Sequence, residues 1–382
     1  MTVTGIICEY NPLHLGHQRQ LTAIRALRGG DSGIVCVMSG NFVQRGAPAI
    51  VDKGLRAKAA VLCGADLVLE LPVTAALSSA EGFASEGVRL LAPICDTLCF
   101  GAETADKAKL LAAAEALLSP AFSGALRQEL DKGLSFPAAR QAALTAMEID
   151  ASFLSQPNNI LAVEYCKAIL AQSAALEPLP IMRPGDYHAA DADPENPSAT
   201  SIRERILTGQ PWLAYVPEEA RRVFQDAPLH TPQSGERAVL GKLRAMADRE
   251  FEALPYGSEG LWRKLMHATR QEASVDAIAS SVKSKRYTRT RIDRMILCAF
   301  LGLTQRDISA PAPYARVLAF NDKGREILKK AKANGCYPNI GEDIEHPYQS
   351  LEYRADDLYG LFAIDTPEPA GQAAKRRVYY HR

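Results

Sequence analysis

Short strand-like runs alternate with helical segments through the first half of this chain. Runs rich in β-branched and apolar residues occur at 3–8, 33–38, 66–71, 97–100 and 179–182. Segments of helical composition and period lie between them, at 16–27, 53–63 and 105–118. This alternation predicts parallel βαβ units, and therefore an α/β fold with a doubly wound parallel sheet covered by helices on both faces. Because such folds bind ligands beyond the carboxyl ends of their strands, the residues after each strand are the first candidates for a site.

The second half has a different character. Residues 207–310 are helical in composition, and one further strand and helix are predicted at 315–320 and 323–334. The acidic, proline-punctuated segment 186–197 predicts a mobile loop before them. We therefore expect an α/β domain, a helical domain and a small C-terminal α/β segment, at 1–205, 206–310 and 311–382.

Composition limits the class of protein. A chain of 382 residues is long enough for two or three domains. Its 44 basic and 44 acidic residues give a formal net charge of +0, so bulk charge neither favours nor opposes a nucleic-acid partner. The eight cysteines include no CxxC pair, which predicts reduced and mostly buried thiols. The first residues do not resemble a signal peptide and no apolar run approaches about 20 residues, so we expect a cytoplasmic protein that does not associate with a membrane.

The strongest local motif follows the first strand, where residues 14–17 read His-Leu-Gly-His. Two imidazoles three residues apart, with a glycine between them, at the start of a helix combine side-chain donors, open amides and the positive end of the helix dipole. This combination favours a site for a polyphosphate. The alternatives are two polar residues that cap a surface helix, or two ligands of an incomplete metal site. No other His or Cys lies at ligand spacing nearby, so no metal site is predicted.

Longer motifs surround this turn. They read Glu-Tyr-Asn-Pro-Leu-His-Leu-Gly-His at 9–17, Met-Ser-Gly-Asn-Phe-Val-Gln-Arg-Gly at 38–46, Phe-Gly-Ala-Glu at 100–103 and Gln-Pro-Asn-Asn-Ile-Leu at 156–161. The His-x-Gly-His turn resembles the signature of the nucleotidyltransferase superfamily, and the motifs together resemble the bacterial tRNA(Met) cytidine acetate ligase family. The resemblance extends over essentially the whole chain and is densest before residue 205. It implies a Rossmann-like nucleotidyltransferase domain.

The resemblance also implies a reaction in two steps. Acetate attacks the α-phosphate of ATP and forms acetyl-adenylate and pyrophosphate. The exocyclic amine of the wobble cytidine in elongator tRNA(Met) then takes the acetyl group, which leaves N4-acetylcytidine and AMP. ATP is a substrate here, Mg²⁺ is expected with it, and no tightly bound cofactor is implied.

The same resemblance implies which residues form the site. His14 and His17 are the catalytic candidates. The residues expected to bind ATP are Ile7, Cys8, Glu9, Tyr10, Asn11, Pro12, Leu13, His14, Leu15, Gly16, His17, Gln18, Arg19, Gln20, Gly101, Asn158 and Arg183. Asn159 is the alternative to Asn158. Gly101 is expected to follow the fourth strand directly, and Arg183 is expected to end the fifth, so both lie at the predicted ligand edge.

Two other polar segments each have a functional and a purely structural interpretation. Ser39, Asn41, Gln44 and Arg45 follow the second strand and are candidates for recognition of acetate or cytosine, or they form a solvated loop. The segment 198–203, Ser-Ala-Thr-Ser-Ile-Arg, resembles a helix start that contacts the triphosphate in this superfamily. Its Ser201-x-x-Glu204 is equally a capping box.

A basic stretch at 263–294 contains nine basic residues against three acidic ones. Hydroxyl groups and one aromatic ring alternate with its cations, as contacts to an RNA backbone and to stacked bases require. We predict tRNA binding by Lys283, Lys285, Arg286, Arg289 and Arg291, with a solvated helix face as the alternative.

The function expected from sequence is therefore an ATP-dependent acetate ligase that acts on elongator tRNA(Met), without an obligate protein partner. One alternative is an adenylyltransferase that acts on a small cofactor precursor, which leaves the basic stretch unexplained. The other is an RNA-binding protein that holds a nucleotide without turning it over.

Overall fold

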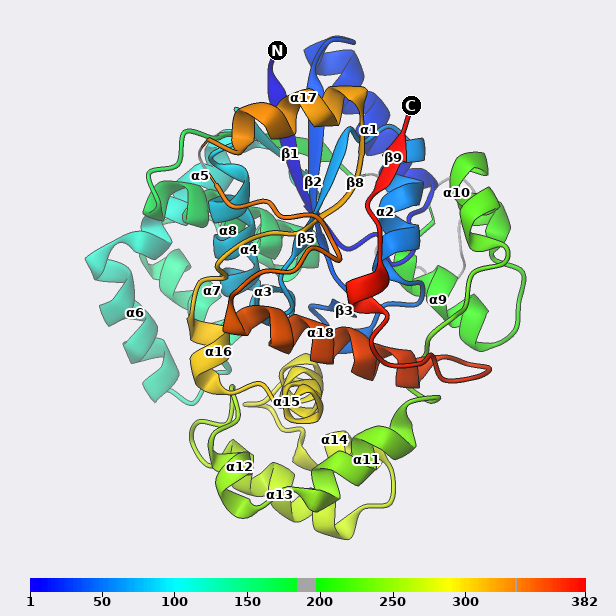
Figure 1. Ribbon diagram of the computed structural model, residues 1–382. Helices are drawn as coiled ribbons and strands as arrows, with labels where there is room; N and C mark the ends of the chain where they lie inside the picture. Colours follow the sequence, from blue (N-terminus) through cyan, green and yellow to red (C-terminus); the bar gives the residue numbers. More distant parts are fainter. Residues whose placement is uncertain (184–196, 334) are drawn as a thin grey trace.

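The computed structural model describes residues 1–183, 197–333 and 335–382 of the chain (Figure 1). Most of the loop predicted at 186–197 therefore lies outside the described residues. A seven-stranded sheet forms the centre, in the order β7-β6-β1-β2-β5-β8-β9. The bounds of these strands are β1 Val3–Cys8, β2 Gly33–Ser39, β5 Leu67–Leu71, β6 Thr97–Ala102, β7 Glu177–Met182, β8 Val317–Asn321 and β9 Tyr379–His381.

The strands β1, β2, β5, β6 and β7 are parallel, so all five predicted strands form a parallel sheet as expected. The fourth strand is longer than predicted, and Gly101 lies within it rather than directly after it. The strand β8 runs antiparallel to β5, and β9 runs parallel to β8. The C-terminal segment therefore contains the predicted strand and helix, and both of its strands extend the central sheet.

Eighteen α-helices are present in the described residues. Those before residue 184 are α1 Leu15–Arg28, α2 Lys53–Leu62, α3 Val73–Ala76, α4 Ala80–Leu91, α5 Lys107–Leu118, α6 Pro120–Asp131, α7 Phe136–Ala146 and α8 Pro157–Ala171. Those after it are α9 Ala199–Leu207, α10 Glu218–Phe224, α11 Glu236–Ala245, α12 Asp248–Glu252, α13 Leu261–Gln271, α14 Val275–Val282, α15 Arg289–Leu301, α16 Gln305–Ser309, α17 Asp322–Ala331 and α18 Pro347–Tyr359. A hairpin of β3 Phe42–Val43 and β4 Ala47–Pro48 follows β2.

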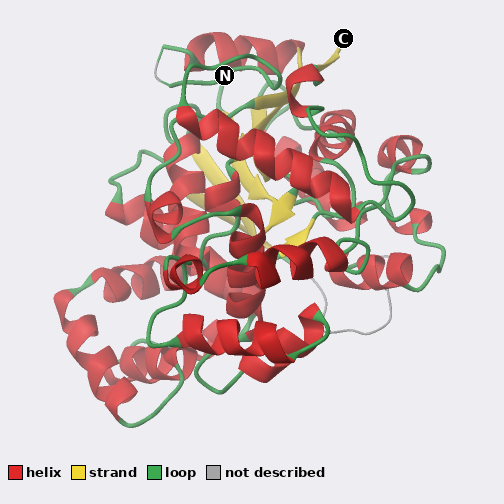
Figure 2. Ribbon diagram, turned by 60° about the horizontal axis from the view of Figure 1, so that its bottom comes forward, coloured by secondary structure: helices red, strands yellow, loops and turns green. Residues whose placement is uncertain are grey.

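Both faces of the sheet are buried, which explains why its strands read as continuous apolar runs. Alternate residues of β2 belong to different cores: Val35 and Val37 pack with α4, α5 and α8, whereas Ile34, Cys36 and Met38 pack with α1 and α2. Figure 2 shows the strands enclosed by helices. This arrangement is the doubly wound fold that the sequence predicts.

The helices α11 to α15 form a separate hydrophobic core together with α18 and the side chain of Phe42. Figure 1 shows α11 to α14 at the bottom of the molecule, with α15 and α18 between them and the sheet. Phe42 belongs to the β3–β4 hairpin, so the helical region packs directly on the segment that follows β2. The boundaries of the three parts expected from sequence stay a prediction.

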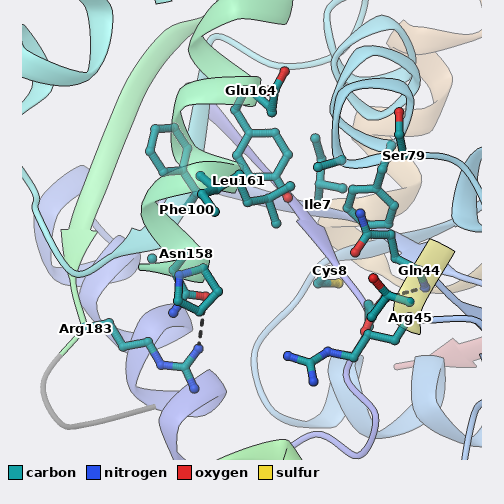
Figure 3. Close-up of a pocket in the computed structure, with 18 of the residues that line it drawn as sticks. Ile7, Cys8, Gln44, Arg45, Ser79, Phe100, Asn158, Leu161, Glu164 and Arg183 are labelled. Atoms are coloured by element: carbon teal, nitrogen blue, oxygen red, sulfur yellow. Dashed lines mark hydrogen bonds between the residues drawn. The ribbon is translucent and has the colours of Figure 1, made fainter. Parts of the chain in front are cut away.

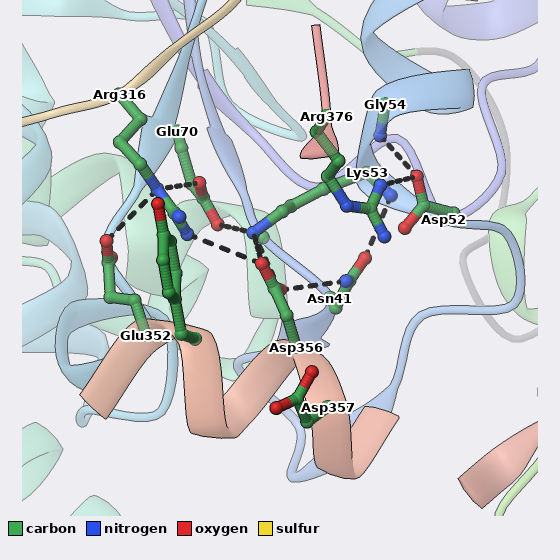
Figure 4. Close-up of polar contacts among 12 residues, drawn as sticks. Asn41, Asp52, Lys53, Gly54, Glu70, Arg316, Glu352, Asp356, Asp357 and Arg376 are labelled. Carbon is green, nitrogen blue, oxygen red and sulfur yellow. Dashed lines mark hydrogen bonds and ion pairs between the residues drawn. The ribbon is translucent and has the colours of Figure 1, made fainter. Parts of the chain in front are cut away.

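A buried cluster of charges attaches α18 to the sheet (Figure 4). Lys53 Nζ lies 2.7 Å from Glu70 Oε1 and 2.6 Å from Asp356 Oδ2, and Arg316 Nε lies 3.0 Å from Glu70 Oε2 and 3.1 Å from Glu352 Oε2. These five side chains are at most 5% exposed. The cluster contains three acids and two bases, and burial raises the pKa of Glu352 to about 7.

Within the described ranges, no single helix is long and apolar enough to cross a membrane. Helices α5 and α6 together have the length and apolar composition of a membrane span, but the chain bends by 79° between them.

Candidate functional site

A cavity of about 1100 Å³ opens at the carboxyl edge of the sheet, where the sequence predicts the site. Its walls include the turn after β1, the starts of α1, α4, α7, α9 and α15, much of α8 and the β3–β4 hairpin. The predicted site residues that line it are Ile7, Cys8, Glu9, Tyr10, Asn11, His14, Gly16, His17, Arg19, Gln20, Gln44, Arg45, Gly101, Asn158, Arg183, Arg286 and Arg291. The predicted residues outside its lining are Pro12, Leu13, Leu15, Gln18, Ser39, Asn41, Lys283, Lys285 and Arg289.

The two histidines occupy the start of α1. His14 is the N-cap residue, and its Nδ1 accepts a hydrogen bond from the amide of Gly16 at 3.1 Å. His17 Nδ1 accepts a hydrogen bond from the amide of His14 at 3.3 Å. Because both Nδ1 atoms accept, each neutral ring has its proton on Nε2, which makes Nε2 the donor. The rings stack with centroids 3.7 Å apart. His14 Nε2 is buried and has no hydrogen-bond partner among the described residues.

Both imidazoles are neutral near pH 7. Burial lowers the pKa of His14 well below its usual value, and the nearby His17 and Arg183 lower it further. Burial and Arg183 lower the pKa of His17 to about 3. The site therefore offers neutral N–H donors together with the cationic Arg183, an arrangement suited to the oxygens of a polyphosphate.

The turn between β1 and α1 is held from two sides. Asn11 Oδ1 accepts from the amide of Ile50 at 2.8 Å, and the carbonyl of Asn11 accepts from Arg203 Nη1 at 2.7 Å. The side chain of Leu13 is fully buried in the core with α1 and α2. Some residues of the 7–20 segment therefore line the cavity, whereas others hold the turn in its conformation.

A second wall forms where β6 and β7 end. Glu103 accepts from Asn158 Nδ2 at 2.6 Å and from the amide of Asn159 at 2.8 Å, so it anchors the first turn of α8. Arg183 Nη1 donates to Asn158 Oδ1 at 3.4 Å (Figure 3). Asn159 is 1% exposed and bonds to the amide of Thr104 instead. The structure thus places Asn158 at the cavity and Asn159 in the core. Glu103 belongs to the Phe-Gly-Ala-Glu motif, but no role was predicted for it.

The β3–β4 hairpin forms the opposite wall. Figure 3 shows Gln44 and Arg45 across the cavity from Asn158 and Arg183. The amide of Gln44 donates to Glu9 Oε1 at 2.8 Å, which ties the hairpin to the turn after β1.

Ser39 and Asn41 do not reach the cavity. Ser39 is fully buried, and Asn41 is 3% exposed. The Asn41 amide group donates to Asp356 at 3.0 Å and accepts from the amide of Lys53 at 2.8 Å. Through these two hydrogen bonds, Asn41 joins the hairpin to the buried charge cluster. A polar residue after a strand suggests a ligand contact, but the hydrogen-bonding groups of Asn41 are already occupied by protein partners.

The helical region meets the cavity through the start of α15. The lining here includes Arg286, Thr288, Thr290, Arg291 and Arg294. Sequence reasoning missed the two threonines and Arg294, because only their place in the fold distinguishes them from other residues of the basic stretch. Three other predicted contacts lie elsewhere: Lys283 and Lys285 are exposed, and Arg289 forms ion pairs with Asp276 and Asp293 at 2.8 Å.

The contact between α15 and the hairpin is very close. Arg294 Nη1 donates to the carbonyl of Gln44 at 3.3 Å. Gly46 has a φ of 81°, and a Cβ there would lie 2.5 Å from the carbonyl carbon of Asp293 and against the amide nitrogen of Arg294. Only glycine fits both this conformation and this approach.

The capping box at Ser201 and Glu204 suggested a helix that starts at Ser201, but α9 starts at Ala199. Ser198 is the N-cap, and its Oγ accepts from the amide of Ser201 at 3.0 Å. Thr200 and Arg203 line the cavity, in line with a contact to a bound anion. Across the described parts of the chain, no group of three or more His, Cys, Asp or Glu is arranged to hold a metal ion.

Comparisons with known proteins agree with this geometry. The family described as HIGH nucleotidyl transferase matches residues 1–373. A tRNA(Met) cytidine acetate ligase of Acetivibrio thermocellus is 36% identical over 89% of this chain and 88% of its own. A protein of the same name from Clostridium kluyveri is 38% identical over 96% of this chain and 94% of its own.

Two solved structures are similar over the full length of both chains, at 29% identity. They are Thermotoga maritima TmcAL in an apo form, with a TM-score of 0.91, and the same protein bound with alpha-thio ATP, with a TM-score of 0.88. The resemblance seen in the motifs is confirmed. This chain belongs to the HIGH nucleotidyl transferase family and, within it, to the tRNA(Met) cytidine acetate ligases.

Proposed function

We propose that this protein is an ATP-dependent acetate ligase that forms N4-acetylcytidine at the wobble position of elongator tRNA(Met) through acetyl-adenylate. One observation supports this most strongly: the paired histidines at the start of α1 and the basic start of α15 line the same cavity. The nucleotide site and a surface suited to RNA therefore share one cavity. A reaction that transfers a nucleotide-activated acid to an RNA base requires this proximity.

In the first step an acetate oxygen attacks the α-phosphorus of ATP, and pyrophosphate leaves. The reaction needs positioning and stabilisation of negative charge more than covalent chemistry. We assign the Nε2–H donors of His14 and His17 to the phosphates, with Arg183 and Arg203 supplying positive charge. Asn158 and Gly101 border the end of the cavity that we assign to the nucleoside. Magnesium enters with ATP.

In the second step the N4 amine of cytidine attacks the acetyl carbonyl, a proton leaves the amine, and AMP departs. Gln44 and Arg45 are proposed to contact acetate or the incoming base, since the hairpin lies between the nucleotide turn and α15. Arg286 and Arg291 are proposed to bind the RNA backbone beside the cavity, and Lys283 and Lys285 to bind it further out. A tRNA substrate places the enzyme in the cytoplasm.

His17→Ala tests the phosphate role. We expect acetate-dependent exchange of labelled pyrophosphate into ATP to fall by about a hundredfold, since a lost donor in a preorganised site costs that order. Affinity for tRNA stays the same. His267→Ala, an exposed histidine on α13 outside the cavity, is the matched control and keeps the parent rate. Equal exchange rates for both variants would remove His17 from the first step.

The RNA surface is tested by Lys285→Ala with Arg286→Ala. We expect weaker tRNA binding, a shallower dependence on salt and an unchanged rate of pyrophosphate exchange, because phosphate contacts release counterions. The control is Lys329→Ala with Lys330→Ala on α17, which lies at the opposite end of the sheet (Figure 1). The same loss of affinity in both double variants would show that the basic start of α15 is not the binding surface.

A further inference from the structure

Arg56 on α2 has a completely buried side chain and no place in the motifs. Its Nε donates to the carbonyl of Val51 at 2.8 Å, and its Nη1 donates to the carbonyls of Glu9 at 2.5 Å and Ser39 at 3.1 Å. Its Nη2 donates to the carbonyl of Gly40. All four acceptors are backbone oxygens, and no carboxylate among the described residues forms an ion pair with this guanidinium.

A buried cation that forms no ion pair is costly, and the carboxylates of Asp52 and Glu9 offset part of that cost through space. Burial lowers the pKa of Arg56, but guanidinium groups keep their proton in proteins. The carbonyl dipoles offset part of the cost.

The segments that Arg56 joins form two walls of the cavity. Glu9 belongs to the turn that leads into His14, and Gly40 leads into the hairpin with Gln44. These walls also touch through the hydrogen bond between the Gln44 amide and the Glu9 carboxylate. Arg56 therefore lies behind both walls and fixes the distance between them.

We infer that Arg56 is a positioning residue for the nucleotide site: its guanidinium holds the turn after β1 against the start of the β3–β4 hairpin, and its positive charge behind that turn favours a bound triphosphate. It touches no substrate atom. This inference rests on the proposed adenylation of acetate, and it adds a residue to the site that neither the motifs nor the cavity lining contains.

Two substitutions separate geometry from charge. Arg56→Lys keeps the charge but can bond to fewer of the four carbonyls, so we expect the kcat of pyrophosphate exchange to fall by about a hundredfold while the Kd for ATP changes less than about threefold. Arg56→Met removes the charge as well. We expect it to weaken ATP binding by about tenfold further and to leave the binding of uncharged adenosine within about twofold.

The control is Arg316→Lys, because Arg316 is an equally buried arginine whose partners are carboxylates away from the cavity. It should lose stability and keep the kcat and Kd of its folded fraction. A purely structural role for Arg56 predicts the same behaviour for all three variants, and that result would overturn the inference. A parent protein without acetate-dependent exchange would instead refute the proposed function.

A measurement on the parent protein keeps the inference testable if the Arg56 variants do not fold. Helix α2 supplies no residue to the cavity lining, so ATP cannot shield it directly. If Arg56 couples α2 to the two walls, ATP slows hydrogen exchange at the first turns of α2, whereas adenosine does not. Protection restricted to the turn after β1 and the start of α1 would contradict the inference.

Discussion

The helical region packs closely on the β3–β4 hairpin at Gly46, so Gly46→Ala tests the coupling between this region and the nucleotide site. Two costs follow from the structure. The φ of 81° is left-handed, where an alanine costs about 1–2 kcal/mol. The new Cβ would lie 2.5 Å from the Asp293 carbonyl carbon, about 1 Å inside ordinary carbon contact. Because that neighbour is backbone, the hairpin and α15 must separate by about this amount.

A displacement of about 1 Å in a reacting geometry can cost a factor of about 100 in rate. We expect Gly46→Ala to lower acetyl transfer to tRNA by that order. Pyrophosphate exchange should fall less, because Arg56 and Glu9 still hold the hairpin to the turn after β1. Urea unfolding should show a loss of about 2–4 kcal/mol.

Gly302→Ala is the matched control for Gly46→Ala. Gly302 ends α15 with a φ of 68°, but a Cβ there meets only the guanidinium of Arg354, at 3.8 Å. This variant carries the backbone cost alone and should lose about 1 kcal/mol with normal transfer. Equal transfer rates in the two variants would refute the reasoning that the close approach positions the RNA surface against the site.

Three further outcomes follow from the buried ionisable groups. Lys53→Met leaves acids of the buried cluster uncompensated and should cost about 3–5 kcal/mol in urea unfolding, and adding Asp356→Asn should recover part of that loss. The raised pKa of Glu352 means that the folded protein binds this proton more tightly than the unfolded chain, so stability falls as the pH rises from 4.5 toward 7; Glu352→Gln should therefore be more stable than the parent at pH 8 and equal to it below pH 4.5. The lowered pKa values of His14 and His17, and the amide bonds that their Nδ1 atoms accept, keep both rings neutral at pH 6, so a pH–rate profile of pyrophosphate exchange should show no loss of rate from these rings between pH 6 and pH 8.

Local sequence predicted the parallel part of the sheet because each of those strands is buried on both faces and reads as an apolar run. The position of β8 was not predictable in this way. Its pairing with β5 joins residues about 250 positions apart, and composition does not reveal whether such a strand starts a new sheet or extends an existing one. Longer-range packing likewise brings α18 under the hairpin through Lys53 and Asp356.

For the site, the sequence predicted that the histidine turn, Asn158 and Arg183 lie together, because their motifs follow strands that end at one edge, and these residues line one cavity. It also proposed Ser39 and Asn41, whose side chains are buried. The local sequence shows a polar residue but not its hydrogen-bond partner. For Asn41 that partner is Asp356, which lies near the other end of the chain. Arg56 was missed for the converse reason: its partners are backbone carbonyls, which leave no trace in the sequence.

We propose that one cavity both activates acetate and transfers the acetyl group to RNA. To test this, the protein is incubated with ATP, magnesium, radiolabelled acetate and unmodified elongator tRNA(Met), and the RNA is then digested to nucleosides. We expect label in N4-acetylcytidine that depends on ATP and on the wobble cytidine. A folded protein that binds ATP and leaves the RNA unlabelled would contradict it.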